Sequence, residues 1–75
     1  MTTVHTRDLA TGELMDIYDK ASIGSNAQIE ATHALGRVGG IAAAKKLIEI
    51  YNNSSKGSNL QLAAIKALGE VGRVP

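Results

Sequence analysis

The chain repeats itself with a period of 33 residues. Residues 14–39 and 47–72 align without a gap, and 14 of the 26 aligned positions are identical, including the Ala-Leu-Gly triplets at 34–36 and 67–69. A period of this length is typical of repeat arrays, in which one supersecondary element buries its apolar face only against a neighbouring copy. We therefore expect a fold built from two copies of one element.

Each copy contains the start and end signals of a helix. Residues 25–28 (Ser-Asn-Ala-Gln) and 58–61 (Ser-Asn-Leu-Gln) match the capping box. In this motif the Ser hydroxyl and the Gln side chain each accept a backbone N–H that would otherwise lack a partner. The second and fourth helices should therefore start here and end just before Gly39 and Gly72, which can take the left-handed conformation of a helix terminus.

Two further helices precede these. The first is expected to run from Arg7 or Asp8 to Ala21, with Thr6 as its N-cap. The third is expected from about Ile41 to Asn52, after a tight reversal at the glycine pair 39–40. The segments predicted to be helical thus alternate with short polar or glycine-rich turns.

Small apolar residues line one face of the second and fourth helices. On a helical wheel the stripe consists of Ala27, Ala31, Ala34, Leu35 and Val38, with Leu60, Ala64, Ala67, Leu68 and Val71 as counterparts. The chain has no Phe and no Trp, so closely packed helices are favoured over a sheet. We predict an all-α fold, a short right-handed α-solenoid of two stacked helical hairpins (7–39 and 40–72) with tails at 1–6 and 73–75.

Composition excludes several classes of protein. The net charge is +1, with eight basic and seven acidic residues spread along the chain, so no strong attraction to nucleic acid or to a membrane surface is expected. There is no Cys for a disulfide or a thiolate metal site. The sequence contains neither a signal-peptide pattern nor a run of 18 apolar residues. We therefore expect a cytoplasmic protein.

The motif Ala31-x-x-Ala-Leu-Gly-x-Val-Gly39 is followed by Ala43 and Leu47 and recurs at 64–72. With it, the chain from about residue 7 onward resembles the short HEAT-like repeats of phycobilisome-lyase-type proteins. The resemblance implies an α-solenoid that binds other proteins. Members of the family often carry an acidic residue in the inter-helix turn and an Arg early in the second helix. The matching positions here hold Gly24 and Gly57, and Gln28 and Gln61.

Some proteins with similar repeats are enzymes, namely iron hydroxylases with His-Glu pairs and basic DNA glycosylases. This chain has no His-Glu dipeptide and no excess of positive charge, so neither activity is implied. His33 is the only histidine within the repeats, whereas a metal site needs several ligands. Asp16 and Glu49 recur at one repeat position, but on outer helices where acidic residues usually face water. We expect no enzyme activity, no cofactor and no metal.

Two other recurring residue types have structural explanations. Gln28 and Gln61 could bind a partner, but the capping box already accounts for them. Tyr18 and Tyr51 could contact a ligand, but their placement beside Ile17 and Ile50 favours packing.

The second and fourth helices also carry apolar residues away from the core stripe. Ile29 and its counterpart Leu62 lie opposite that stripe, with Ile65 nearby, which indicates either a surface for another protein or wider burial between stacked helices. If it is a partner surface, its contact positions are Ile29, Thr32, His33, Arg37, Leu62, Ile65, Lys66 and Glu70.

Two repeats leave an apolar edge exposed, because arrays usually need three or more repeats with polar ends. A homodimer about a twofold axis would cover it. The favoured function is thus a non-enzymatic protein–protein interaction or scaffold module, with an unidentified protein partner. One alternative is a nucleic-acid-binding solenoid that uses Arg37, Lys45, Lys46, Lys66 and Arg73 on phosphates. The other is an accessory subunit of a lyase-type enzyme, which would need a deep apolar pocket.

Overall fold

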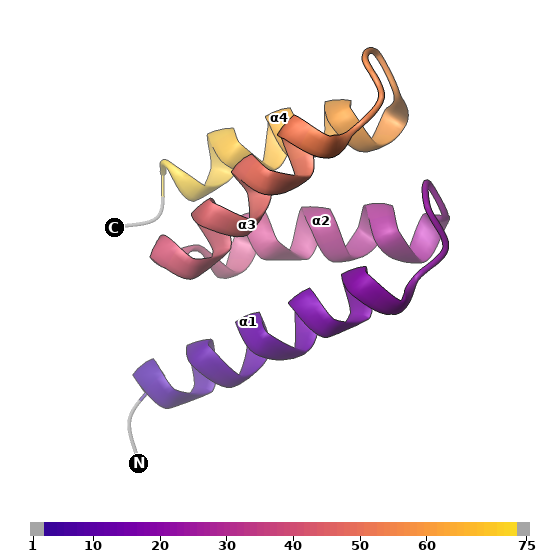
Figure 1. Ribbon diagram of the computed structural model, residues 1–75. Helices are drawn as coiled ribbons and strands as arrows, with labels where there is room; N and C mark the ends of the chain where they lie inside the picture. The colour runs from indigo at the N-terminus through magenta and orange to yellow at the C-terminus, as the bar shows by residue number, and fades with distance from the viewer. Residues whose placement is uncertain (1–2, 74–75) are drawn as a thin grey trace.

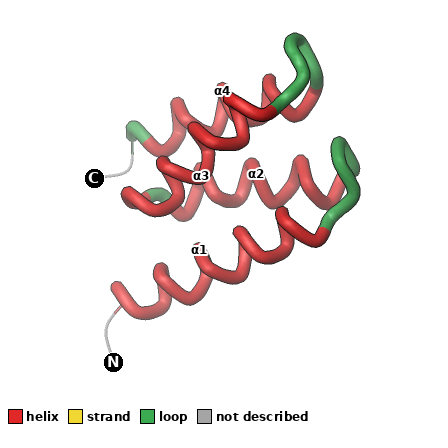
Figure 2. Tube along the Cα trace, viewed as in Figure 1, coloured by secondary structure: helices red, strands yellow, loops and turns green. Residues whose placement is uncertain are grey.

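The computed structural model describes residues 3–73 and shows that they are all-α, as the sequence predicts (Figures 1 and 2). The helices are α1 (Thr3–Lys20), α2 (Asn26–Val38), α3 (Gly40–Asn53) and α4 (Asn59–Val71). No strand occurs within these residues.

The helices form two antiparallel hairpins, α1 with α2 and α3 with α4 (Figure 1). The most extensive contact in the described chain joins α2 to α4, which lie side by side and run in the same direction. By contrast, α1 and α3 touch only slightly. The right-handed solenoid stays a prediction, because two units do not define a superhelix.

The two capping boxes form with one difference from the expected bonds. The Oγ atom of Ser25 accepts the Gln28 N–H at 3.2 Å, as predicted. The Gln28 Oε1 atom, however, accepts the N–H of Gly24 at 2.8 Å rather than that of Ser25. The Ser25 N–H is already bonded to the carbonyl of Ser22, at 3.0 Å. The second repeat has the same three bonds.

Helix α1 begins earlier than the sequence indicated. It starts at Thr3, so Thr6 lies within the helix and the prediction that Thr6 is the N-cap is wrong. Residues 3–6 contain neither Gly nor Pro, and β-branched residues lower helix propensity only slightly, so nothing stops the helix before Arg7. The outer ends of the two predicted tails, residues 1–2 and 74–75, lie outside the described residues.

The two predicted helix-ending glycines differ. Gly39 has φ 74° and Gly40 has φ 88°, because α2 must reverse directly into α3. Gly72 has φ −67° and ψ −18°, so the prediction of a left-handed residue there is wrong. Its N–H still bonds to the Leu68 carbonyl at 3.1 Å, which extends the right-handed path by one residue.

The core lies where α4 meets α2 and α3. Its buried residues are Leu35, Ala43, Leu47, Ile50, Leu60, Ala64 and Ala67. Most of the predicted stripe is buried or half-buried, but Ala27 is exposed. Its counterpart Leu60 in the second repeat is only 8% exposed, so the same position is buried in one repeat and open to solvent in the other.

The two repeats approach most closely at Gly36 of α2. A Cβ atom built on Gly36 would lie 2.8 Å from both the Cα and the Cβ of Ala67 in α4. The counterpart of Gly36 is Gly69, and a Cβ built there meets no described atom within 4 Å. The glycine at this repeat position therefore permits close helix contact in the first repeat, at Gly36, but faces open space in the second, at Gly69.

This difference predicts opposite results for one substitution at two positions. Gly36→Ala should lower the free energy of unfolding by about 1–3 kcal/mol, because the backbone of Ala67 must move. Gly69→Ala should be neutral or stabilising by up to about 1 kcal/mol, because Ala favours the helix and has room. Urea unfolding of dilute protein, monitored by circular dichroism, measures the change in the free energy of unfolding of each variant. Equal losses in the two variants would show that α2 and α4 do not meet at Gly36.

Candidate functional site

A groove of about 240 Å³ runs between α2 and α4. It is lined by Ile29, His33, Asn59, Leu62, Ala63 and Lys66. Four of the eight residues predicted as partner contacts, Ile29, His33, Leu62 and Lys66, are therefore brought together. Each helix contributes an apolar residue and, four positions later, a basic or titratable one.

The repeat itself explains this arrangement. Because α2 and α4 run in the same direction side by side, equivalent residues of the two copies lie at similar heights (Figure 1). Residues four apart share a helix face, so Ile29 lies one turn before His33 on α2, and Leu62 lies one turn before Lys66 on α4. Ala63 is 3% exposed and small, which leaves space between the two rows.

Thr32 was predicted to contact a partner, and that prediction is wrong. Thr32 is fully buried, and its Oγ1 atom donates a hydrogen bond to the Gln28 carbonyl at 2.9 Å. Gly36 lies one turn further along the same face of α2 and approaches Ala67 of α4, so this face points toward the neighbouring repeat. Its counterpart Ile65, at the same position of the last repeat, is 49% exposed.

The remaining predicted contacts lie outside the groove. Arg37 and Glu70 are exposed near the ends of α2 and α4 and do not line it. Ile65 does not line it either. Ile29 is only half-buried and also packs against the core cluster, so both interpretations of this residue, burial and partner contact, apply in part.

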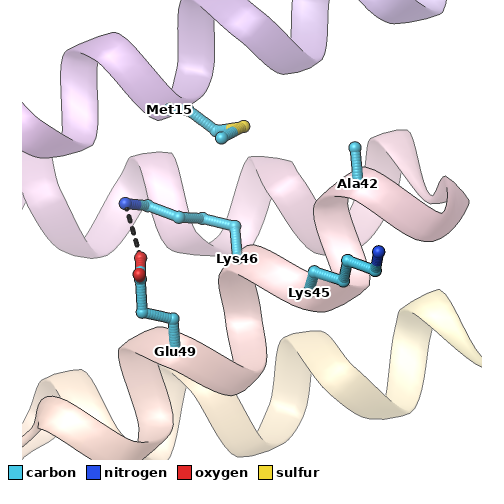
Figure 3. Close-up of a pocket in the computed structure, with 5 residues that line it drawn as sticks. All are labelled: Met15, Ala42, Lys45, Lys46 and Glu49. Atoms are coloured by element: carbon cyan, nitrogen blue, oxygen red, sulfur yellow. Dashed lines mark hydrogen bonds and ion pairs between the residues drawn. The ribbon is translucent and has the colours of Figure 1, made fainter.

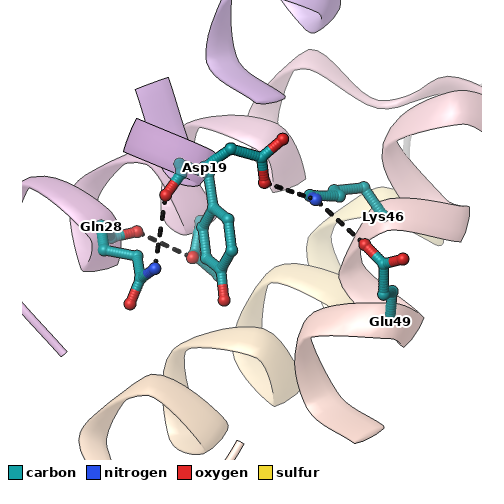
Figure 4. A network of polar contacts seen from close by, with 6 residues as sticks. Asp19, Gln28, Lys46 and Glu49 are labelled. Carbon is teal, nitrogen blue, oxygen red and sulfur yellow. Dashed lines mark hydrogen bonds and ion pairs between the residues drawn. The ribbon is translucent and has the colours of Figure 1, made fainter. Parts of the chain in front are cut away.

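A polar network that the sequence pattern did not reveal joins the two hairpins between α1 and α3, away from the α2–α4 groove. The Lys46 Nζ atom lies 2.9 Å from both Asp19 Oδ1 and Glu49 Oε1 (Figure 4). It also lies 5.0 Å from the centroid of the Tyr18 ring, a cation–π distance. The Lys46 side chain is 11% exposed. This lysine was considered for phosphate binding, but its charge is used between α1 and α3.

Gln28 completes the link at the end of α1. It is 4% exposed, and its Nε2 atom donates to the Tyr18 carbonyl at 3.3 Å (Figure 4). Its Oε1 atom accepts the N–H of Gly24 in the α1–α2 turn at 2.8 Å. The structural explanation of Gln28 therefore agrees with its contacts. Asp16 forms an exposed i,i+4 ion pair with Lys20 at 2.9 Å.

The surroundings of this network raise the pKa of two groups, the Lys46 ammonium and the Tyr18 hydroxyl. Burial by itself lowers the pKa of Lys46, but hydrogen bonds and charge from Asp19 and Glu49 outweigh it, so the pKa is raised. Burial raises the pKa of Tyr18, and the Lys46 charge offsets only part of this. A group with a raised folded-state pKa stabilises the fold below its unfolded pKa, about 10 for both residues, and loses that effect as pH rises through the folded value.

A second groove, of about 420 Å³, lies between α1 and α3. Figure 3 shows its lining residues, Met15, Ala42, Lys45, Lys46 and Glu49. It is broadly open to solvent, and the Lys46 ammonium on its wall is already paired with Glu49. This groove therefore lacks the depth that binding of a pigment-like ligand would require.

Among the residues whose side chains the structure describes, 6–73, no group of three or more His, Asp or Glu side chains is placed to hold a metal ion. None of the described helices is both long enough and apolar enough to cross a membrane. Comparison of the chain with models of protein families, with curated proteins and with solved structures finds no match.

The role of Lys46 can be tested by comparing its substitution with that of the adjacent Lys45. Lys46→Met keeps the apolar stem but removes the charge, and should lower the free energy of unfolding by about 1 kcal/mol at pH 7. Lys45→Met, at an exposed position, should change it by less than about 0.5 kcal/mol.

The Lys46→Met deficit relative to the parent chain should shrink as the pH rises above the unfolded pKa of lysine, about 10.4, and through the raised folded-state pKa of Lys46, because the parent lysine then loses its own proton. Urea unfolding at pH 7 and at alkaline pH measures this difference. A deficit that is independent of pH, or one equalled by Lys45→Met, would contradict the assigned role of the ammonium group.

Proposed function

We propose that this chain is a non-enzymatic, cytoplasmic protein-interaction module of the HEAT-like type, which binds a protein partner in the groove between α2 and α4. The observation that carries the proposal is the meeting of Ile29 and Leu62 with His33 and Lys66 in one groove. The stacked hairpins, the repeated caps and the close Gly36–Ala67 contact support a HEAT-like array.

The groove indicates the chemistry of its partner. Leu62 is 49% exposed, so an apolar side chain placed on it would remove both surfaces from water. Lys66 and His33 lie one turn further along and suit a carboxylate next to that side chain. We expect a segment of another protein with an apolar anchor and an adjacent acidic residue, a mode of binding in which a groove between helices provides the specificity.

The two alternatives have less support. A phosphate-binding surface requires basic residues on one face, but Lys45 lies in the α1–α3 groove and Lys66 in the α2–α4 groove. Lys46 is engaged by two carboxylates. An accessory role in a lyase would require a deep apolar pocket, and both grooves are open.

Selection from a displayed library of random short peptides tests the proposal. Peptides enriched on the parent chain should combine an apolar with an acidic residue. Leu62→Asp and Lys66→Glu should each weaken their binding by about tenfold or more, the effect of losing one buried apolar contact or one charge pair. Leu9→Asp is the matched control, since Leu9 is 74% exposed on α1, away from the groove. Its affinity should match that of the parent.

Two results would count against the groove. One is the failure of selection to enrich any sequence. The other is a set of peptides that bind the Leu62 and Leu9 variants equally well. Circular dichroism of each variant confirms that lost binding does not reflect lost helix.

A further inference from the structure

The two repeats present the same face to different surroundings. In the first repeat this face meets the second repeat, since Met15 and Tyr18 pack against the core cluster, Thr32 is fully buried and Gly36 approaches Ala67. Its counterpart in the second repeat consists of Ile48 and Tyr51 on α3 and Ile65 and Gly69 on α4, which we call the C-terminal edge. Ile48, Tyr51 and Ile65 are 49%, 40% and 49% exposed.

The edge is more apolar than its covered counterpart. The fully buried Thr32 is matched by the half-exposed Ile65, and the ion-paired Asp19 by the uncharged Asn52. An exposed end of a repeat array is normally polar, because solubility requires it. A change toward apolar residues at an exposed face therefore indicates that something covers it.

The opposite edge of the array cannot be that cover. There the exposed Glu30 stands where the second repeat has Ala63, which is only 3% exposed in the contact between repeats. Head-to-tail stacking of two chains would place the Glu30 carboxylate in that buried position without a partner, which is costly. The C-terminal edge itself has no such obstacle, since Ile48, Tyr51, Ile65 and Gly69 carry no charge at neutral pH.

We propose that a second copy of this chain covers the C-terminal edge about a twofold axis, with the two α4 helices antiparallel. Ile65 and Gly69 are one turn apart, so a twofold axis midway between them brings each Ile65 against the Gly69 of the partner. The open space over Gly69 receives that side chain. Such pairing is closed and isologous, the commonest symmetry of protein dimers. This pairing goes beyond the interaction proposed for the α2–α4 groove, because it uses a different surface and a different partner.

The size of the edge fixes the strength expected. A helix of 13 residues is about 20 Å long, and two helices side by side are about 20 Å wide. The resulting face, about 400 Å² in projection, is smaller than the roughly 800 Å² per partner of a standard stable interface. We therefore expect a dimer that dissociates in the micromolar range.

Sedimentation equilibrium of the full chain over the micromolar range tests the proposal. The parent should shift from the monomer mass of 7.8 kDa toward twice that value as concentration rises. Ile65→Asp should remain monomeric at every concentration. Ile23→Asp, at a 94% exposed loop residue, is the matched control and should dimerise like the parent.

Gly69→Ala separates pairing from folding. If the Ile65 of the partner lies against Gly69, an added methyl group should weaken the dimer by about tenfold or more, as the 2.8 Å approach at Gly36 illustrates. The dilute monomer should keep its melting temperature or gain, since Ala favours the helix. A folding defect would instead lower both the affinity of the dimer and the melting temperature of the monomer.

Three results would overturn the proposal. These are a parent chain that is monomeric at the highest concentration, oligomers that grow beyond the dimer, and a Gly69→Ala variant that dimerises like the parent. Lys66→Glu should dimerise normally, since Lys66 lies in the groove. A chain that dimerises but binds no peptide would therefore count against the groove and not against the edge.

Discussion

The close approach of α2 to α4 at Gly36 is the constraint on which the other features depend. With no Cβ on Gly36, the backbone of α2 comes within contact distance of the Ala67 backbone, and the two helices can pack along Ala-lined faces. That proximity buries Thr32 and covers the core from one side. It also sets the separation of Ile29 and Leu62, and hence the width of the groove. A chain of this size with no Phe or Trp has few other ways to exclude water, because its side chains are too small to span a wider gap.

The opposite side of the molecule is held differently. Between α1 and α3 the contact is slight, and Lys46 of α3 connects them through Asp19 and the face of Tyr18 on α1. Lys46 also pairs with Glu49 on its own helix. Both carboxylates are more than half exposed, so water screens these ion pairs and their contribution to stability is small. Only the Lys46–Asp19 pair joins α3 to the end of α1, because Lys46 and Glu49 both belong to α3. Close packing on one side and a directed polar link on the other therefore position the two hairpins together.

The features that could be read from the sequence are those that depend on one helix and its own caps. The extents of α2 and α4 were predictable from Ser-x-x-Gln and from the following glycine, and the buried stripe followed from helical spacing. Thr32 was misplaced because a helical wheel gives the angle of a side chain but not the position of the neighbouring helix. Lys46 was missed for a related reason, since its partner Asp19 is 27 residues away and belongs to another hairpin.

Differences between the two copies therefore say more about function than their identities. Equivalent positions that pack inside each hairpin, such as Leu35 and Leu68, hold the same residue because their surroundings are the same in both copies. Some positions that face along the array differ, as Glu30 differs from Ala63, because in the described chain one copy has a neighbour on that side and the other does not. On this view the exposed Glu30, in place of the buried Ala63, makes the outward face of the first repeat suited to water. Ile65 in place of Thr32 marks the other edge as one adapted to contact, because an isoleucine half in water gains stability only when another surface removes it from water.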